Sequence, residues 1–177
     1  MKKTMIKAIV LLSILSSMSM AESMYFGGGI SNEDLDVDDN GIGLEVMVGK
    51  VFNNNFGIEG RVSKTITEAE EKAGNLTAKG DATVLSIFAT YSHKLSPEFT
   101  IMPKIGFSNF SLDVTVSNGI NSTSNDDSSS DITFGIDLKY QLNFNSNLYA
   151  SFTKYQPKLF GENDKFTYLS AGYQQNF

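Results

Sequence analysis

The sequence predicts an all-β protein, an eight-stranded antiparallel up-and-down transmembrane β-barrel. Three observations predict it. After residue 21, apolar and polar residues alternate with a period of two in eight segments, which is typical of strands with two different faces. Short and long connections alternate between these segments, as in a meander whose tight turns all lie at one end. The polar faces are rich in Gly, Ser and Thr and poor in charge, which suits a crowded interior.

The expected strands follow one another along the chain. Their ranges are 24–31, 41–52, 56–66, 82–93, 99–110, 131–142, 147–156 and 166–177. Short turns are expected at 53–55, 94–98 and 143–146, each rich in turn-forming residues. Long loops are expected at 32–40, 67–81, 111–130 and 157–165. A strand of about 12 residues exceeds the ~9–11 that a tilted strand needs to cross hydrocarbon.

Each expected strand has one apolar face, made of every second residue. In chain order these faces lie within 26–30, 42–48, 56–62, 85–91, 99–107, 132–142, 148–152 and 169–177. Periodicity does not say whether this face points to lipid or to a soluble core. Aromatic residues near the short turns favour lipid, because they would form an interfacial girdle. They are Phe52, Phe56, Tyr91, Phe99, Tyr140, Phe144, Tyr173 and Phe177.

The composition excludes several functions. The chain has 177 residues, one His, no Cys and a formal net charge of −6. Without Cys it forms no disulfide framework and no thiolate metal site, and we expect no metal and no cofactor. A net acidic chain is a poor partner for nucleic acid.

The first residues have the features of a secretory signal. A basic start precedes an apolar run over 8–15, and Ser19 and Ala21 place small residues at the positions that a signal peptidase reads. We predict a cleaved signal peptide over 1–21 and one barrel domain over 22–177. An uncleaved anchor is the alternative, although a helical span needs about 20 apolar residues.

Six charged residues fall on the expected inner face, three of each sign. Unpaired buried charge is costly, so this balance favours a barrel with a low-dielectric interior. The predicted interior charge network comprises Glu45, Glu59, Arg61, Lys104, Asp137 and Lys139. It would be either a gate for ions or a structural plug. The plug is favoured, because the side chains of an eight-stranded barrel just fill its interior.

Three residues on the apolar face need an explanation. Pro103 lies in mid-strand, where it cannot donate a ladder hydrogen bond, so we expect a bulge or a split strand. Lys64 and Lys154 lie toward the long loops, where their ammonium groups can reach the interface.

The last strand ends in a recognisable pattern. Ser170, Gly172, Tyr173 and Phe177 fit a terminal assembly signal, and Gln175 departs from it. With the eight segments, this end resembles the small outer-membrane β-barrels related to OmpA and OmpX. The resemblance implies an integral protein of the bacterial outer membrane. It also implies contact with outer-membrane lipid and lipopolysaccharide, and recognition by the barrel-assembly machinery.

Other motifs carry weaker signals. Residues 36–41 are similar to a calcium loop but lack its helices and terminal Glu, so a solvated acidic surface, or divalent cations bridging it to lipopolysaccharide, is the better account. His93 with Ser96 could form a base–nucleophile pair, but they lie beside a short turn, and we expect no enzyme. Gly27, Gly28 and Gly29 fit close packing where the barrel closes.

We therefore expect a monomeric outer-membrane barrel with a structural or surface-interaction role. Its short turns and both termini would face the periplasm, and its long loops the outside. One alternative is a narrow channel for small solutes or ions. A second is a periplasmic lipocalin-like binding protein.

Overall fold

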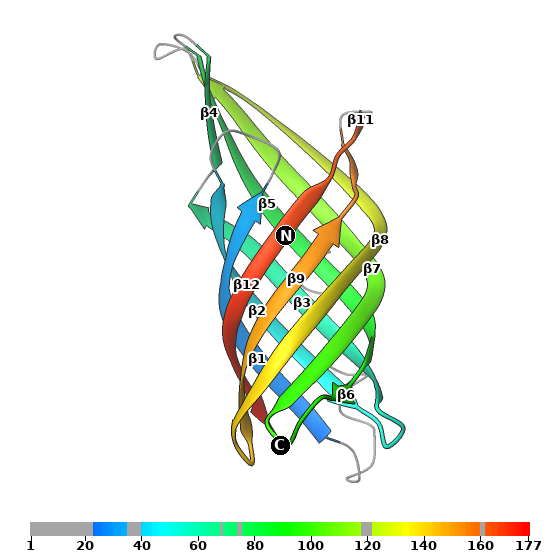
Figure 1. The fold of residues 1–177 in the computed structure, drawn as a ribbon. Coiled ribbons are helices and arrows are strands. Elements are labelled where there is room, and N and C mark those ends of the chain that lie inside the picture. The colour runs from blue at the N-terminus through cyan, green and yellow to red at the C-terminus, as the bar shows by residue number, and fades with distance from the viewer. Residues whose placement is uncertain (1–22, 35–39, 68, 74–75, 118–121, 160–161) are drawn as a thin grey trace.

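The computed structural model shows a closed antiparallel β-barrel (Figure 1). It describes residues 23–34, 40–67, 69–73, 76–117, 122–159 and 162–177. Within these ranges no helix has the length and apolar character needed to cross a membrane. The signal-peptide prediction for 1–21 and most of the calcium-like segment lie outside the described residues.

Eight long strands form the wall. They are β1 (Ser23–Asp34), β2 (Gly41–Val51), β3 (Phe56–Thr67), β5 (Leu76–Tyr91), β7 (Phe99–Ser117), β8 (Ser122–Asn143), β9 (Ser146–Tyr155) and β12 (Phe166–Asn176). Each pairs with the next long strand, and β1 pairs with β12 to close the cylinder. Four short strands complete the set: β4 (Ala69–Ala73), β6 (His93–Lys94), β10 (Lys158–Leu159) and β11 (Glu162–Asn163). The predicted eight-stranded meander is confirmed.

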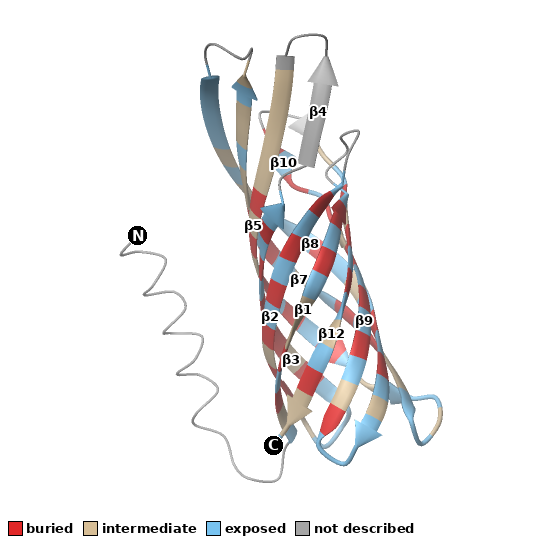
Figure 2. Cartoon of the chain, turned by 90° about the vertical axis from the view of Figure 1, so that its left-hand side faces the viewer, coloured by how far each residue is buried: buried red, intermediate tan, exposed pale blue. Residues whose placement is uncertain are grey.

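Exposure alternates along the strands and places the apolar faces outside (Figure 2). On β2, Leu44 and Val46 are exposed, whereas Glu45 and Met47, which alternate with them, are buried. The same holds on every long strand, so an apolar belt surrounds a largely polar interior. A soluble lipocalin-like barrel needs the reverse arrangement, and the described structure therefore does not support that alternative.

Aromatic pairs line the belt at the end with the short turns. Phe56 contacts Tyr91 and Phe99 contacts Tyr140, with ring centroids 5.0 and 5.1 Å apart. All four rings are exposed on the outer surface. The tyrosine of each pair has an apolar ring and a polar hydroxyl, which suits the boundary between hydrocarbon and water.

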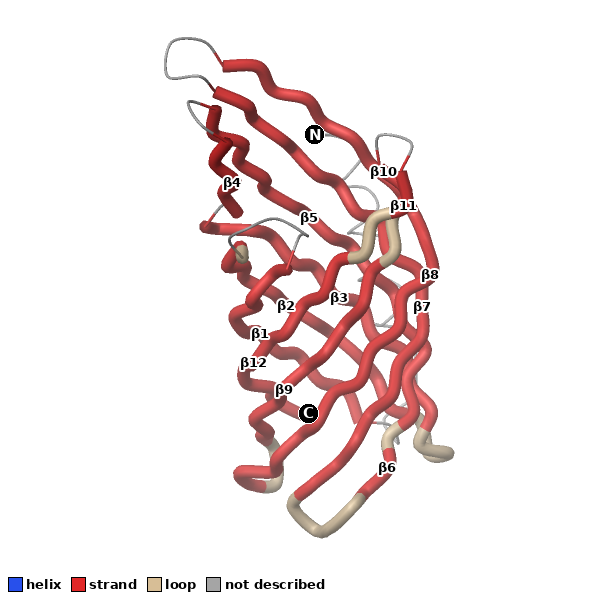
Figure 3. Tube along the Cα trace, turned by 45° about the horizontal axis from the view of Figure 1, so that its top comes forward, coloured by secondary structure: helices blue, strands red, loops and turns tan. Residues whose placement is uncertain are grey.

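Three strands extend well beyond the belt at the long-loop end (Figure 3). β7 and β8 stay paired without a register break from Phe99↔Tyr140 to Ser117↔Ser122. The expected loops at 67–81 and 111–130 are therefore wrong, since β4 and the ends of β5, β7 and β8 occupy most of them. Apolar and polar residues still alternate in the sequence through Leu112, Val114 and Val116. The backbones of the neighbouring strands complete the hydrogen-bond ladder there. The expected loop at 157–165 likewise contains the β10–β11 hairpin.

Pro103 is accommodated by its neighbour. β7 runs through it without a bulge, and Pro103 pairs with Ile136 on β8. On the other side, pairing with β5 ends at Thr90↔Lys104, and β6 resumes it at His93↔Ile101. β7 itself is neither bulged nor split, so the expectation for this strand is wrong. The interruption lies in the partner strand, because proline offers no N–H there.

Glycines make room for large inward side chains. Tyr149 projects from β9, and its hydroxyl lies against Gly29 of β1 and Gly172 of β12. A Cβ built on Gly29 would stand 2.5 Å from that hydroxyl and closer still to the Ala171 carbonyl oxygen. Gly28, the preceding residue, faces outward, and a Cβ built there would have its nearest contact at 3.4 Å. The interior is thus filled by matching large residues with small ones.

We predict that Gly29→Ala destabilises the barrel by about 1–3 kcal/mol, because the methyl group has no space beside Tyr149. Gly28→Ala is the matched control and should change stability by less than about 0.5 kcal/mol. The stability of both variants is measured by urea unfolding, with the mobility of unboiled protein on gels as the signal for the folded state. Equal stability of the two variants would contradict the packing described here.

Candidate functional site: the interior charge cluster

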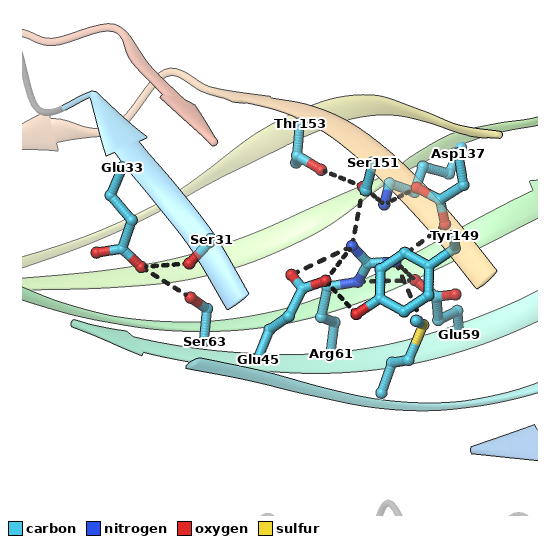
Figure 4. Close-up of polar contacts among 12 residues, drawn as sticks. Ser31, Glu33, Glu45, Glu59, Arg61, Ser63, Asp137, Tyr149, Ser151 and Thr153 are labelled. Atoms are coloured by element: carbon cyan, nitrogen blue, oxygen red, sulfur yellow. Dashed lines mark hydrogen bonds and ion pairs between the residues drawn. The ribbon is translucent and has the colours of Figure 1, made fainter. Parts of the chain in front are cut away.

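Five of the six charged residues predicted for the interior meet at one level of the barrel (Figure 4). They project from four strands because each occupies an inward position of the alternation. Glu45 comes from β2, Glu59 and Arg61 from β3, Lys104 from β7 and Asp137 from β8. All are at most 4% exposed. We call these five residues the charge cluster.

Arg61 is the centre of the charge cluster. Its guanidinium forms ion pairs with three carboxylates: 3.3 Å to Glu45 Oε1, 2.9 Å to Glu59 Oε1 and 3.0 Å to Asp137 Oδ2. Glu45 lies diagonally across the paired strands, where Met47↔Arg61 are register partners. The planar guanidinium offers several donors in fixed directions, which a lysine cannot do.

Lys104 and Ser151 join the far wall to this centre. Lys104 Nζ lies 2.6 Å from Asp137 Oδ1 and donates to Ser151 Oγ at 2.9 Å. Arg61 Nη1 donates to the same hydroxyl at 2.9 Å. Lys104 Nζ also lies 5.1 Å from the ring centre of Phe88. The charge cluster therefore ties β2 and β3 to β7, β8 and β9 across the lumen.

Two tyrosines extend the charge cluster. Tyr149 donates to Glu45 Oε1 at 2.7 Å, and Tyr25 donates to Glu59 Oε2 at 2.8 Å. Neither tyrosine, nor Ser151, was among the predicted site residues. Their inward positions in the alternation are the available signal, but tyrosine is common on both faces of barrels.

Lys139, the sixth predicted residue, lies apart. It is 6% exposed, and its Nζ stands 4.3 Å from the ring centre of Tyr25. It forms no ion pair with any residue that the structure describes. The charge cluster alone carries three carboxylates and two cations, and Lys139 balances the sum from a separate position.

Glu33 was expected in a solvated loop and instead lies inside. β1 continues to Asp34, which pairs with Thr167, and Glu33 has the inward parity of Tyr25. It is fully buried and accepts hydrogen bonds from Ser31 and Ser63 at 2.9 and 3.1 Å, and from Thr65. Buried carboxylates require such donors.

Toward the long loops, the lumen of the barrel is filled by aromatic side chains. Phe110, Tyr155, Phe166 and Tyr168 form a buried aromatic cluster together with Ala82, Val84 and Leu159. Phe110 stacks on Phe166 at 4.8 Å between ring centroids. The interior is therefore not polar throughout, and an apolar layer of close-packed rings covers the charged layer.

The predicted assembly-signal residues occupy the closing strand. Ser170 is buried, whereas Tyr173 and Phe177 are exposed on the outer surface. Phe177 stacks on Phe26 of β1 at 5.5 Å. Gly172 faces inward against Tyr149 and so has a packing role as well.

The described residues contain no group of three or more His, Cys, Asp or Glu side chains that could hold a metal ion. Ser96 Oγ is hydrogen-bonded within its own turn, to Glu98 and to the amide of Phe99.

The charge cluster holds strongly paired ions in a low-dielectric interior. Such an arrangement is suited to closing and bracing the barrel.

Comparisons place this architecture among known barrels. The chain is similar to Ail of Yersinia pestis, solved in complex with the heparin analogue sucrose octasulfate, with 20% identity, a TM-score of 0.60, and coverage of 88% of this chain and 97% of that one. It is similar to OprG of Pseudomonas aeruginosa, with 12% identity, a TM-score of 0.65, and coverage of 89% and 96%. It is also similar to a major outer membrane protein of Thermus thermophilus, with 12% identity, a TM-score of 0.67, and coverage of 88% of this chain and 99% of that one. These likenesses show the fold.

No curated protein matched the sequence. A family model described as "Outer membrane protein beta-barrel domain" matches residues 8–177, almost the whole chain. With the closed eight-stranded wall, its outward apolar belt and its charged interior, this match shows that the chain belongs to the outer membrane protein β-barrel domain family.

Proposed function

We propose that this protein is a closed, monomeric outer-membrane barrel that acts through its extracellular surface rather than as a channel or an enzyme. The observation that carries the proposal is the double closure of the interior. The charge cluster fills one level, and the aromatic cluster fills a second. At these two levels an eight-stranded barrel has room for little else, so side chains from opposite walls meet.

The extension of β5, β7 and β8 supports a surface role. Beyond the belt these strands form a continuous sheet, which holds its side chains more rigidly than a loop does. Asp81, Asp113 and Asp126 are register partners across the three strands and form an acidic row. Like charges directly opposite one another repel, and a cation relieves that repulsion. The row favours a cation over direct contact with a polyanion such as the heparin analogue bound by Ail.

The partner class that we propose is lipopolysaccharide, held through divalent cations between its phosphates and the acidic row. The row lies two residues beyond Thr83 and Ser111, where the outward residues of β5 and β7 have become polar. That is the level of the lipid headgroups if the long-loop end faces outside. The three aspartates do not form a metal site by themselves. The cation would therefore bridge protein and lipid, with the lipid phosphates supplying the missing oxygen ligands.

The route to the membrane is also part of the proposal. Residues 1–21 would direct export and be removed, and the barrel-assembly machinery would recognise the last strand. Phe177 is 74% exposed at the end of that strand, accessible to such a partner.

Arg61→Ala should lower the free energy of unfolding by about 3–5 kcal/mol, because it leaves buried carboxylates without their counter-ion. Lys64→Ala, an outward cation on the same strand, is the control and should have little effect. Urea titration of both variants, with heat-modifiability on gels as the folding check, measures the difference. An unchanged Arg61→Ala barrel would show that the charge cluster does not brace the wall.

Conductance in planar bilayers tests the closed barrel. The wild type and Phe110→Ala should both be silent, because the charge cluster still blocks the lumen when the aromatic cluster is opened. The double variant Arg61→Ala with Phe110→Ala should show steady ion conductance. Stable pores in the wild type would instead establish the channel.

Association with lipopolysaccharide tests the surface role. We expect Mg²⁺-dependent binding of the purified barrel, measured by co-sedimentation with lipopolysaccharide aggregates. Replacing Asp81, Asp113 and Asp126 by Asn should reduce it about tenfold by removing the row's negative charge. Glu98→Gln, at the other end of the barrel, is the control. Equal binding by wild type and triple variant would exclude the acidic row as the contact.

A further inference from the structure

The barrel has a polar vestibule at its short-turn end. Its volume is about 660 Å³, within the range of small-ligand sites. Tyr25 and Lys139 lie at its inner end, next to the charge cluster, and the turns around Asn53 and Phe144 form its rim. Unlike the levels above it, this part of the lumen is hollow.

Lys139 is positioned to contact a ligand that enters the vestibule. Its side chain is almost wholly buried, yet it lines the vestibule. Its Nζ faces the ring of Tyr25, whose hydroxyl is engaged with Glu59. The carboxylates behind it are already paired with Arg61 and Lys104. The ammonium group balances their net charge from a distance, and it donates no hydrogen bond to any residue in the described ranges.

The rest of the described lining adds one further cation, Lys94, and no anion. Lys94 and His93 lie at the rim, both exposed. Carboxamide side chains supply further N–H donors, including Gln141 and Asn147. Among the described residues that line the vestibule there is no aspartate or glutamate. In an acidic protein, a pocket with cations and amides but no carboxylates is unexpected.

We propose that this vestibule binds a phosphate group presented from the compartment that the short turns face. Lys139 would contact it at the inner end and Lys94 at the rim, with amide N–H groups between them. A lysine ammonium is a common phosphate ligand, and its attraction is stronger in a partly enclosed site than in water. The phosphate belongs either to the free ion or to a phospholipid headgroup in the adjoining leaflet.

Calorimetric titration of the folded barrel in an uncharged maltoside detergent tests the site with inorganic phosphate. We expect saturable binding that weakens about tenfold in Lys139→Gln, because one charged donor is lost. Lys94→Gln should also weaken it, and this exposed position leaves the interior packing intact if Lys139→Gln does not fold. Lys64→Gln, outward and toward the long-loop end, should bind like the wild type.

A second arm separates the two sources of phosphate. Short-chain phosphatidylglycerol, titrated in the same detergent, should bind more tightly than inorganic phosphate and compete with it if the headgroup is the ligand. The reverse order assigns the site to the free ion. Absence of saturable binding of either probe to the wild type overturns the proposal, as does an equal loss in Lys64→Gln. These phosphate-binding measurements do not depend on whether the lumen conducts ions or whether the outer sheet binds lipopolysaccharide.

Discussion

The burial of Arg61 is the constraint on which the rest of the structure depends. A guanidinium that is 2% exposed inside a membrane protein cannot stand alone, and three carboxylates from β2, β3 and β8 surround it. Three carboxylates in turn exceed one cation, and Lys104 and Lys139 restore the balance. Because these groups come from opposite walls, satisfying them fixes how the strands stand relative to one another across the lumen.

Packing around this centre follows from the same requirement. Tyr149 and Tyr25 must reach Glu45 and Glu59, and their side chains need the space that glycines on neighbouring strands leave. The outer surface has no such demands, since apolar side chains of many shapes fit against lipid. Substitutions in the interior and on the belt therefore have different consequences even at adjacent positions of one strand.

The two ends of the barrel are chemically different. At the long-loop end the lumen is closed by packed aromatic rings, and the wall continues as a sheet with an acidic row. At the short-turn end the lumen opens into a vestibule lined by cations and amides. This polarity along the axis gives each side of the membrane its own surface, and it directs the proposed interactions to lipopolysaccharide on one side and phosphate on the other.

The sequence by itself determined the eight strands, their meander and which residues point inward, because the period of two assigns every residue to one face. It also placed the six interior charges on that inner face. Only the tertiary structure decided that five of them meet while Lys139 stands apart, since this depends on register across the lumen and on distances between strands remote in sequence.

The strand ends, the buried Glu33 and the aromatic cluster were likewise decided by pairing and packing. A segment rich in Ser and Asp predicts a loop from its sequence alone. It becomes part of the barrel wall when a neighbouring strand forms hydrogen bonds with its backbone groups.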